Sequence, residues 1–196
     1  MKLQDACKSK EITVVGNGPL SPDDRQMIEQ SACIFRFNDR KNMLAGDRTD
    51  VHVVRDNTIH AINRAQQDDV CILPIAARWS TLDKLNDLRN QDYKLLEPLL
   101  IYESYHKKDK VIDDSAVIFP SCKAKSFHAE QVHGPTSGAA VIDWLEQDPS
   151  VETIHVFGMN WNKRDPHVDF VKKKLVETCC TKCEFHKTES PSYFPA

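Results

Sequence analysis

A run of nine residues, ITVVGNGPL at positions 12–20, gives the first indication of the fold. Ile12–Val15 is a short apolar stretch rich in β-branched residues, which is typical of a buried strand. The next four residues, Gly-Asn-Gly-Pro, predict a sharp turn because glycine and proline punctuate regular structure. Ser21 then has the chemistry of a helix cap, with Pro22 in the first helical position. The segment therefore predicts a strand, a tight turn and a helix in direct succession.

The same alternation of short apolar runs and helical segments continues along the chain, which is typical of βαβ units around a parallel sheet. The further strands that we expect are Cys33–Phe37, Val51–Arg55, Val70–Pro74, Val117–Phe119, Thr153–Phe157 and Cys183–His186. The further helices that we expect are Thr58–Gln66, Ser80–Arg89, Ser137–Gln147 and Pro166–Val176. The segment 91–114 lacks clean periodicity and is expected to be rich in loops. The predicted fold is α/β, with a largely parallel central sheet, helices on both faces and a single domain over residues 1–196.

Composition narrows the class of protein. The chain has 196 residues, 40% of them hydrophobic, and a formal net charge of -3. This balance disfavours a protein that coats nucleic acid, since such a surface needs a basic stripe. The sequence contains no run approaching the roughly 20 apolar residues of a membrane-spanning helix. We therefore expect a cytoplasmic protein, or a soluble domain trimmed of its anchor, with no nucleic acid among its partners.

The cysteines favour a reduced protein. There are seven, at positions 7, 33, 71, 122, 179, 180 and 183. An odd number, with some of them inside expected strands, fits free thiols better than a disulfide framework. Cys180 and Cys183 form a lone CxxC pair, which is a weak zinc signal without a second pair at ligand spacing. The sequence therefore predicts no metal site.

Polar residues follow several of the expected strands, where ligands bind in open α/β sheets. In the first such loop, Gly16, Asn17 and Gly18 match neither the GxGxxG fingerprint nor a P-loop. Asp23 and Asp24 would already neutralise the positive end of the following helix. We therefore expect Asn17 and the loop amides, rather than the helix end, to contact a phosphate. The alternative is that this loop is only a tight strand-to-helix turn.

A second glycine-bearing loop has the better chemistry for an anion. Thr136, Ser137 and Gly138 lead directly into an expected helix whose first turn carries no acidic residue. The free amide groups and the dipole of such a helix start are available to a negatively charged group. The alternative is that Ser137 is a plain helix cap. His167 lies just before or within the first turn of another expected helix, after a long polar loop, where an exposed imidazole can act as a general base near neutral pH.

Three sets of residues resemble the motifs of glycosyltransferase family 29. Residues 14–20, VVGNGPL, followed by 34–39, IFRFND, and 46–50, GDRTD, look like the long sialyl motif of that family. Residues 135–138, PTSG, with 154–158, IHVFG, are similar to its short motif. His167 with Phe170 and Leu175 resembles its very short motif. The opening glycine loop is also similar, more distantly, to that of bacterial family 42 sialyltransferases.

The resemblance implies a Rossmann-like GT-A variant that transfers sialic acid, or a related ulosonic acid, from a CMP-sugar to a glycan hydroxyl. Asn17 and Asn38 would contact the phosphate and ribose, in a loop formed with Gly16 and Gly18. Thr136, Ser137 and Gly138 would hold the nucleotide or the sugar carboxylate. His167 would deprotonate the acceptor, and attack would be inverting. The family needs neither a metal nor another cofactor.

The chain departs from the family pattern in three respects. The two cysteines that join the long and short motifs in animal enzymes of the family have no counterparts here. Lys172 stands where the very short motif has a glutamate, and Asn160-Trp161-Asn162 occupies the region of a His-Tyr-Tyr motif. Two alternatives follow. One is a non-catalytic protein that binds CMP or a sugar nucleotide. The other is a hydrolase that acts on a sugar nucleotide with the same fold.

Overall fold

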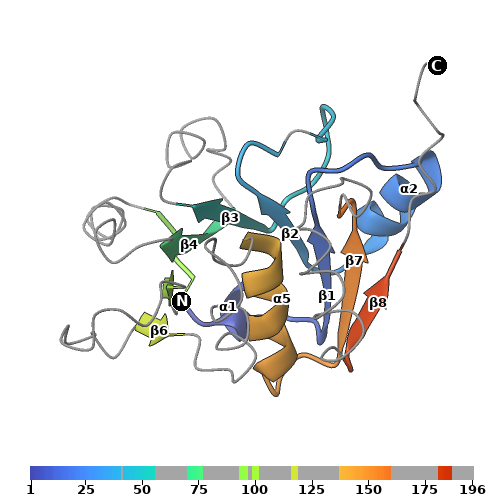
Figure 1. The fold of residues 1–196 in the computed structure, drawn as a ribbon. Helices are drawn as coiled ribbons and strands as arrows, with labels where there is room; N and C mark the ends of the chain where they lie inside the picture. Colours follow the sequence, from blue (N-terminus) through green and yellow to red (C-terminus); the bar gives the residue numbers. More distant parts are fainter. Residues whose placement is uncertain are drawn as a thin grey trace, which may run out of the picture.

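A single sheet of eight strands forms the centre of the protein, and every neighbouring pair of strands is parallel (Figure 1). The computed structural model describes residues 1–40, 42–55, 70–76, 93–96, 99–101, 116–118, 137–159 and 181–186. The strands are β1 Glu11–Val15, β2 Ile34–Phe37, β3 Val51–Arg55, β4 Cys71–Ala76, β5 Leu99–Ile101, β6 Ala116–Ile118, β7 Thr153–Phe157 and β8 Cys183–Phe185. The described helices are α1 Leu3–Ala6, α2 Pro22–Gln30 and α5 Ser137–Gln147. The α/β class and the parallel sheet are thus confirmed.

The order of the strands is β6-β5-β4-β3-β2-β1-β7-β8. From β1 the chain adds strands outward in one direction as far as β6. It then returns to place β7 on the other side of β1, so that β6 and β8 form opposite edges (Figure 1). The direction of strand addition therefore reverses between β1 and β7. In open α/β sheets such a switch point, at the carboxyl ends of the strands, is where ligands bind.

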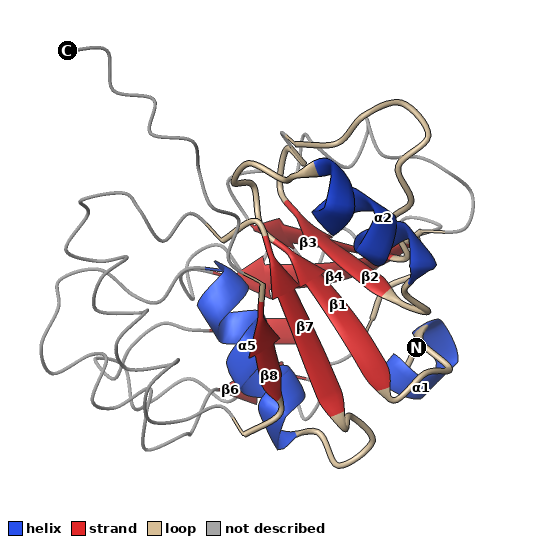
Figure 2. Ribbon diagram, turned by 90° about the vertical axis from the view of Figure 1, so that its right-hand side faces the viewer, coloured by secondary structure: helices blue, strands red, loops and turns tan. Residues whose placement is uncertain are grey.

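The helices α2 and α5 cover opposite faces of the sheet (Figure 2). The alternation of side chains along β1 explains this arrangement, because successive residues of a strand point to opposite faces. Ile12 and Val14 belong to the large buried cluster that includes Leu145 of α5. Val15 instead packs with Ile28 of α2 in a smaller cluster. Both faces of β1 are therefore buried, as its apolar sequence predicts for a central parallel strand.

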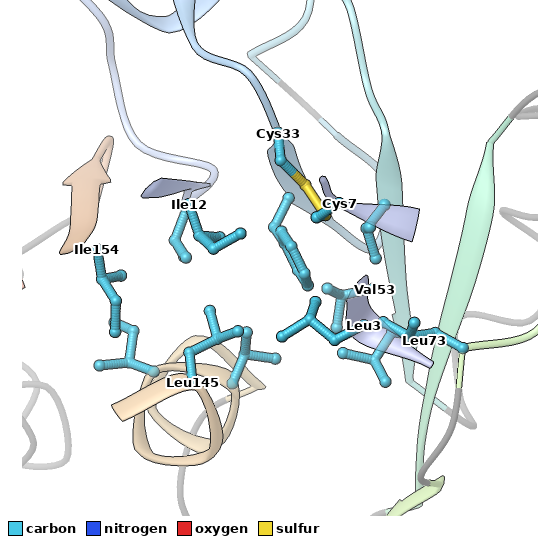
Figure 3. Packing of buried hydrophobic residues seen from close by; sticks show 14 of the residues in the cluster. Leu3, Cys7, Ile12, Cys33, Val53, Leu73, Leu145 and Ile154 are labelled. Atoms are coloured by element: carbon cyan, nitrogen blue, oxygen red, sulfur yellow. A yellow bond between two sulfur atoms is a disulfide. The ribbon is translucent and has the colours of Figure 1, made fainter. Parts of the chain in front are cut away.

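The large cluster also fixes the N-terminus to the sheet. Leu3 of α1 is 5% exposed and lies on the same side of the sheet as Leu145 (Figure 3). A disulfide joins Cys7 to Cys33, whose Cα atoms are 5.5 Å apart. Cys183 is also disulfide-bonded, whereas Cys71 is a buried free thiol. The expectation of uniformly reduced thiols is therefore wrong. The count of cysteines could not show that α1 returns Cys7 to the start of β2.

The local signals at α2 are confirmed. Ser21 caps the helix and accepts a hydrogen bond from the amide of Asp24, while the Asp24 carboxylate accepts one from the amide of Ser21. Pro22 is the first helical residue, as expected. The other expected helices, 58–66, 80–89 and 166–176, lie outside the described residues. Strand β5 lies within the segment that was expected to be loops, because three residues are too few to show periodicity.

None of the helices within the described ranges combines the length and the apolar character that crossing a membrane requires.

Candidate functional site

The loops after β1 and β7 are bonded to each other at the switch point. The amide of Gly16 donates to the carbonyl oxygen of Phe157 at 2.8 Å, and the amide of Gly18 donates to that of Gly158 at 2.6 Å. A Cβ atom on Gly16 would lie 2.5 Å from the Gly158 carbonyl oxygen, so only glycine permits this approach. The first glycine loop is therefore an extension of the β1–β7 pairing.

This pairing changes one expectation about the first loop. The amides of Gly16 and Gly18 already donate to backbone oxygens, so they do not provide the phosphate contact that the sequence suggested. The reason is that strand pairing continues beyond Val15, which the sequence of one strand cannot reveal. The prediction that an acidic residue occupies the positive, N-terminal end of α2 is confirmed, since the Asp24 carboxylate caps the start of its own helix. Asn17 is exposed, between the two buried glycines.

Asn42 also holds the first loop, and no pattern in the sequence had marked this residue. Its side-chain Nδ2 donates to the carbonyl oxygens of both Gly16 and Gly18, at 2.7 and 2.8 Å. Arg25 in turn fixes Asn42, because its guanidinium donates to the Asn42 carbonyl oxygen at 3.0 Å and pairs with Asp47 at 3.0 Å. The amide nitrogen of asparagine carries two N–H donors, one for each of these carbonyl oxygens. Asn42 therefore determines the shape of the loop that carries Asn17.

The residues 46–50 that resemble part of a sialyl motif support the same region. Asp47 accepts from the amide of Leu44 at 2.9 Å, in addition to its ion pair with Arg25. Asp50 accepts from the amide of Ile34 at 2.8 Å and so fixes the first residue of β2. Arg36 is 2% exposed and lies 3.8 Å from Asp47, which offsets the cost of burying its charge. These charged residues therefore have structural partners within the fold.

Asn17 and Asn38 are brought together at the carboxyl end of β2. The Nδ2 of Asn17 donates to the carbonyl oxygen of Phe37, the residue directly before Asn38, at 3.3 Å. Asn38 has a φ of 48°, a left-handed conformation that asparagine tolerates better than most residues. Its amide donates to the Val53 carbonyl at 2.8 Å, and its Oδ1 accepts from the amide of Arg55 at 3.2 Å. The two asparagines thus occupy fixed, adjacent positions beside the switch point.

His52 holds Asn38 in place through a hydrogen bond to its backbone. Its Nε2 lies 2.7 Å from the carbonyl oxygen of Asn38, a geometry that requires Nε2 to carry the proton. The side chain is fully buried, and burial lowers the pKa of His52 from 6.5 to about 4. Its Nδ1 is buried and has no hydrogen-bond partner among the described residues. His52 is therefore a neutral positioning residue near neutral pH, and no sequence pattern had marked it.

The second glycine loop lies close to the first, with the side chain of Met159 between them. A Cβ atom on Gly138 would lie 2.9 Å from the Met159 Cε, and one on Gly16 would lie 3.0 Å from its Sδ. The side chain of Met159 therefore lies between the first loop and the start of α5. The helix starts at Ser137, which is 7% exposed and is the first helical residue rather than the cap. Its first turn carries no acidic residue, as predicted.

Six of the expected site residues thus gather at one end of the sheet: Gly16, Asn17, Gly18, Asn38, Ser137 and Gly138. The other two, Thr136 and His167, lie outside the described residues, as does the departure at Lys172. Comparison of the chain with protein-family models, with curated proteins and with solved structures found no match. The resemblance to glycosyltransferase family 29 therefore remains a prediction from the motifs.

Proposed function

We propose that the protein binds a CMP-activated acidic sugar at the β1–β7 switch point and transfers the sugar to a glycan hydroxyl. It would act as an inverting, metal-independent, sialyltransferase-like enzyme built on a Rossmann-like GT-A variant. The observation that carries this proposal is the convergence of two separate loops. Asn17 and Asn38 lie together after β1 and β2, and the acid-free start of α5 reaches the first loop across Met159.

The two loops suit different parts of a nucleotide sugar. The exposed Asn17 can hydrogen-bond to an anionic oxygen, and hydrogen bonds to charged groups are stronger than neutral ones. The Oδ1 of Asn38 accepts from the backbone of β3, so the amide nitrogen of the same side chain is directed away from that contact. The start of α5 offers the positive end of a helix dipole, and no acidic side chain in its first turn competes with a bound anion for that position. A CMP-linked acidic sugar carries two negative groups, the phosphate and the sugar carboxylate, and could place one at each of these positions.

The chemistry would need little beyond positioning and one base. His167 is proposed to remove the proton from the acceptor hydroxyl, whose oxygen then attacks the anomeric carbon. The bond from that carbon to the CMP phosphate oxygen breaks, and CMP leaves with the bonding pair. Hydrogen bonds at the switch point would stabilise the charge that develops on the departing phosphate.

The decisive experiment measures CMP release from CMP-sialic acid with a panel of glycan acceptors, in the wild type and in His167→Ala. Acceptor-dependent release that is lost in the variant supports a transferase and its base together. Release without an acceptor product would instead identify a hydrolase. Chelator should leave transfer unchanged, because no step of the proposed reaction uses a metal.

Lys172 favours a second candidate, a CMP-binding protein without turnover, since the very short motif has a glutamate at that position. Calorimetry with CMP separates the two. This candidate predicts that CMP binds, that no CMP is released and that Asn17→Ala weakens binding by about 1–3 kcal/mol, the scale of a hydrogen bond to a charged group. Unchanged CMP affinity in Asn17→Ala would remove the proposed site in both cases.

A further inference from the structure

Three potential metal ligands meet between β7 and the edge strand β8, separately from the residues discussed above. His155 lies in the middle of β7 and pairs in register with Glu184 of β8. His186 follows β8 two residues after Glu184, so both side chains lie on the same face of that strand. His155 alternates with the core residues Ile154 and Val156, which places the group on the face of the sheet that α2 covers.

The distances within this group match the geometry of a small cation site. The Nδ1 of His155 lies 3.2 Å from Glu184 Oε2 and 3.4 Å from His186 Nε2. One ligand atom from each of the three residues lies within 4.8 Å of the other two. Metal-to-ligand bonds of about 2.0–2.1 Å in a tetrahedron place neighbouring ligand atoms about 3.3 Å apart. The three side chains therefore need only small movements to share one ion.

Hydrogen bonding explains the group less completely than a cation does. If Nδ1 of His155 carries a proton, that proton must be shared between a carboxylate oxygen and the lone pair of His186 Nε2. If it carries none, it can accept from Nε2 of His186, but its lone pair then also faces the negative charge of Glu184. A divalent cation would accept a lone pair from all three atoms. Two imidazoles and one carboxylate are also a ligand set that zinc uses in proteins.

The surroundings hold the ring of His186 in a fixed orientation. Its ring stacks on Phe157, with the ring centres 4.1 Å apart and the planes 4° from parallel. Its backbone amide donates to the Val156 carbonyl oxygen at 2.9 Å.

We propose that His155, Glu184 and His186 form a binding site for a divalent cation of the zinc class. Nδ1 of His155, a carboxylate oxygen of Glu184 and Nε2 of His186 are the three protein ligands, and water takes the remaining position. The Glu184 side chain is 61% exposed, so the ion can enter from solvent. The bound ion would join the edge strand β8 to β7. The site is independent of the proposed sugar transfer.

The test is calorimetric titration of the full chain with zinc chloride after chelator treatment and dialysis. The expected result is one zinc ion per chain. His155→Ala, His186→Ala and Glu184→Gln should each weaken binding at least about 100-fold, since even disturbing an outer partner of a ligand costs 10–100-fold. Glu152→Gln is the matched control, because Glu152 is exposed and pairs with Lys10 instead. That control should bind zinc as the wild type does.

Cobalt(II) identifies the ligands, because thiolates give an intense charge-transfer band and a nitrogen and oxygen site does not. The wild type should show only weak visible bands, and these should disappear in the double variant His155→Ala/His186→Ala. Circular dichroism confirms that the variants remain folded. Stoichiometric zinc binding that survives in the folded double variant, a thiolate band, or no zinc binding by the wild type would each overturn the proposal. None of these outcomes depends on CMP binding or transfer.

Discussion

The side-chain amide of Asn42 donates to the carbonyl oxygen of Gly16 at 2.7 Å, across 26 residues of sequence. The same Nδ2 donates to Gly18, so one side chain holds both ends of the turn that contains Asn17. The two glycine carbonyls cannot bond to each other, and a donor from elsewhere in the chain is the means of satisfying them. The position of Asn17 therefore depends on a residue far from it in sequence.

Asn42→Asp should destabilise the protein by about 1–3 kcal/mol, because it replaces a donor with a carboxylate that faces two carbonyl oxygens. The shape of the side chain is nearly unchanged, so the effect reports the loss of the two hydrogen bonds together with the repulsion between the carboxylate and the two carbonyl oxygens. Urea unfolding at pH 7 measures it. Asn17→Asp is the comparison, since Asn17 is exposed and bonds to one carbonyl at 3.3 Å. Equal stability of Asn42→Asp and the wild type would contradict the role assigned to Asn42.

Gly16→Ala and Gly138→Ala should differ in stability although both glycines border Met159. At Gly16 the new methyl group would meet the fixed carbonyl of Gly158 at 2.5 Å, so we expect a loss of about 1–3 kcal/mol, as for other overpacked sites. At Gly138 it would meet the flexible end of Met159 at 2.9 Å, and alanine gains up to about 1 kcal/mol over glycine in a helix. Gly138→Ala should therefore stay within about 1 kcal/mol of the wild type. Thermal unfolding of both variants tests the contrast, and a larger loss at Gly138 would refute it.

His52 should make the protein less stable in mild acid. Its pKa is about 4 in the folded protein and 6.5 ordinarily, so between these values the unfolded chain binds the proton and the folded chain does not. Stability is therefore complete above pH 6.5 and decreases as the pH falls towards 4. At pH 5 the loss is about 2 kcal/mol, since one pKa unit corresponds to about 1.4 kcal/mol. Urea unfolding at pH 7 and pH 5 measures this difference. It should shrink in His52→Gln, which keeps a donor for Asn38, and a difference as large as that of the wild type would rule His52 out as its source.

The disulfide between Cys7 and Cys33 should contribute about 3–4 kcal/mol, the chain-entropy value for a loop of this length. We expect the free energy of unfolding of Cys7→Ala/Cys33→Ala to fall by about that amount relative to the oxidised wild type. Cys71→Ala is the control, because Cys71 is a buried free thiol. Mass spectrometry of alkylated peptides checks the bond directly. Alkylation of Cys7 and Cys33 without prior reduction would show that the bond is absent.

Local signals in the sequence predicted local structure well. Ser21 and Pro22 define the start of α2 because a cap and the first helical turn involve only neighbouring residues. The apolar runs of β1 and β7 likewise predicted buried parallel strands. The glycines and asparagines that follow these strands were recognisable as candidate site residues, because ligands bind at the carboxyl ends of parallel strands.

Features that depend on the order of the strands could not be predicted in this way. Nothing near Asn42 indicates that it bonds to Gly16, and nothing near Met159 indicates that it lies against Gly138. The position of β7 beside β1 determines both the use of the Gly16 amide and the meeting of the two loops. In the same way, His155 and Glu184 meet only because β8 pairs in one particular register with β7.

The disulfide between Cys7 and Cys33 also changes what a protease could do to this protein. It closes a covalent ring that contains β1, the first glycine loop and α2. A single cut anywhere in that ring would leave both pieces attached through sulfur. The nicked protein would keep its mass under non-reducing conditions and separate into two fragments only after reduction. The segment that carries Asn17 is thus secured to the sheet even if its own backbone is broken.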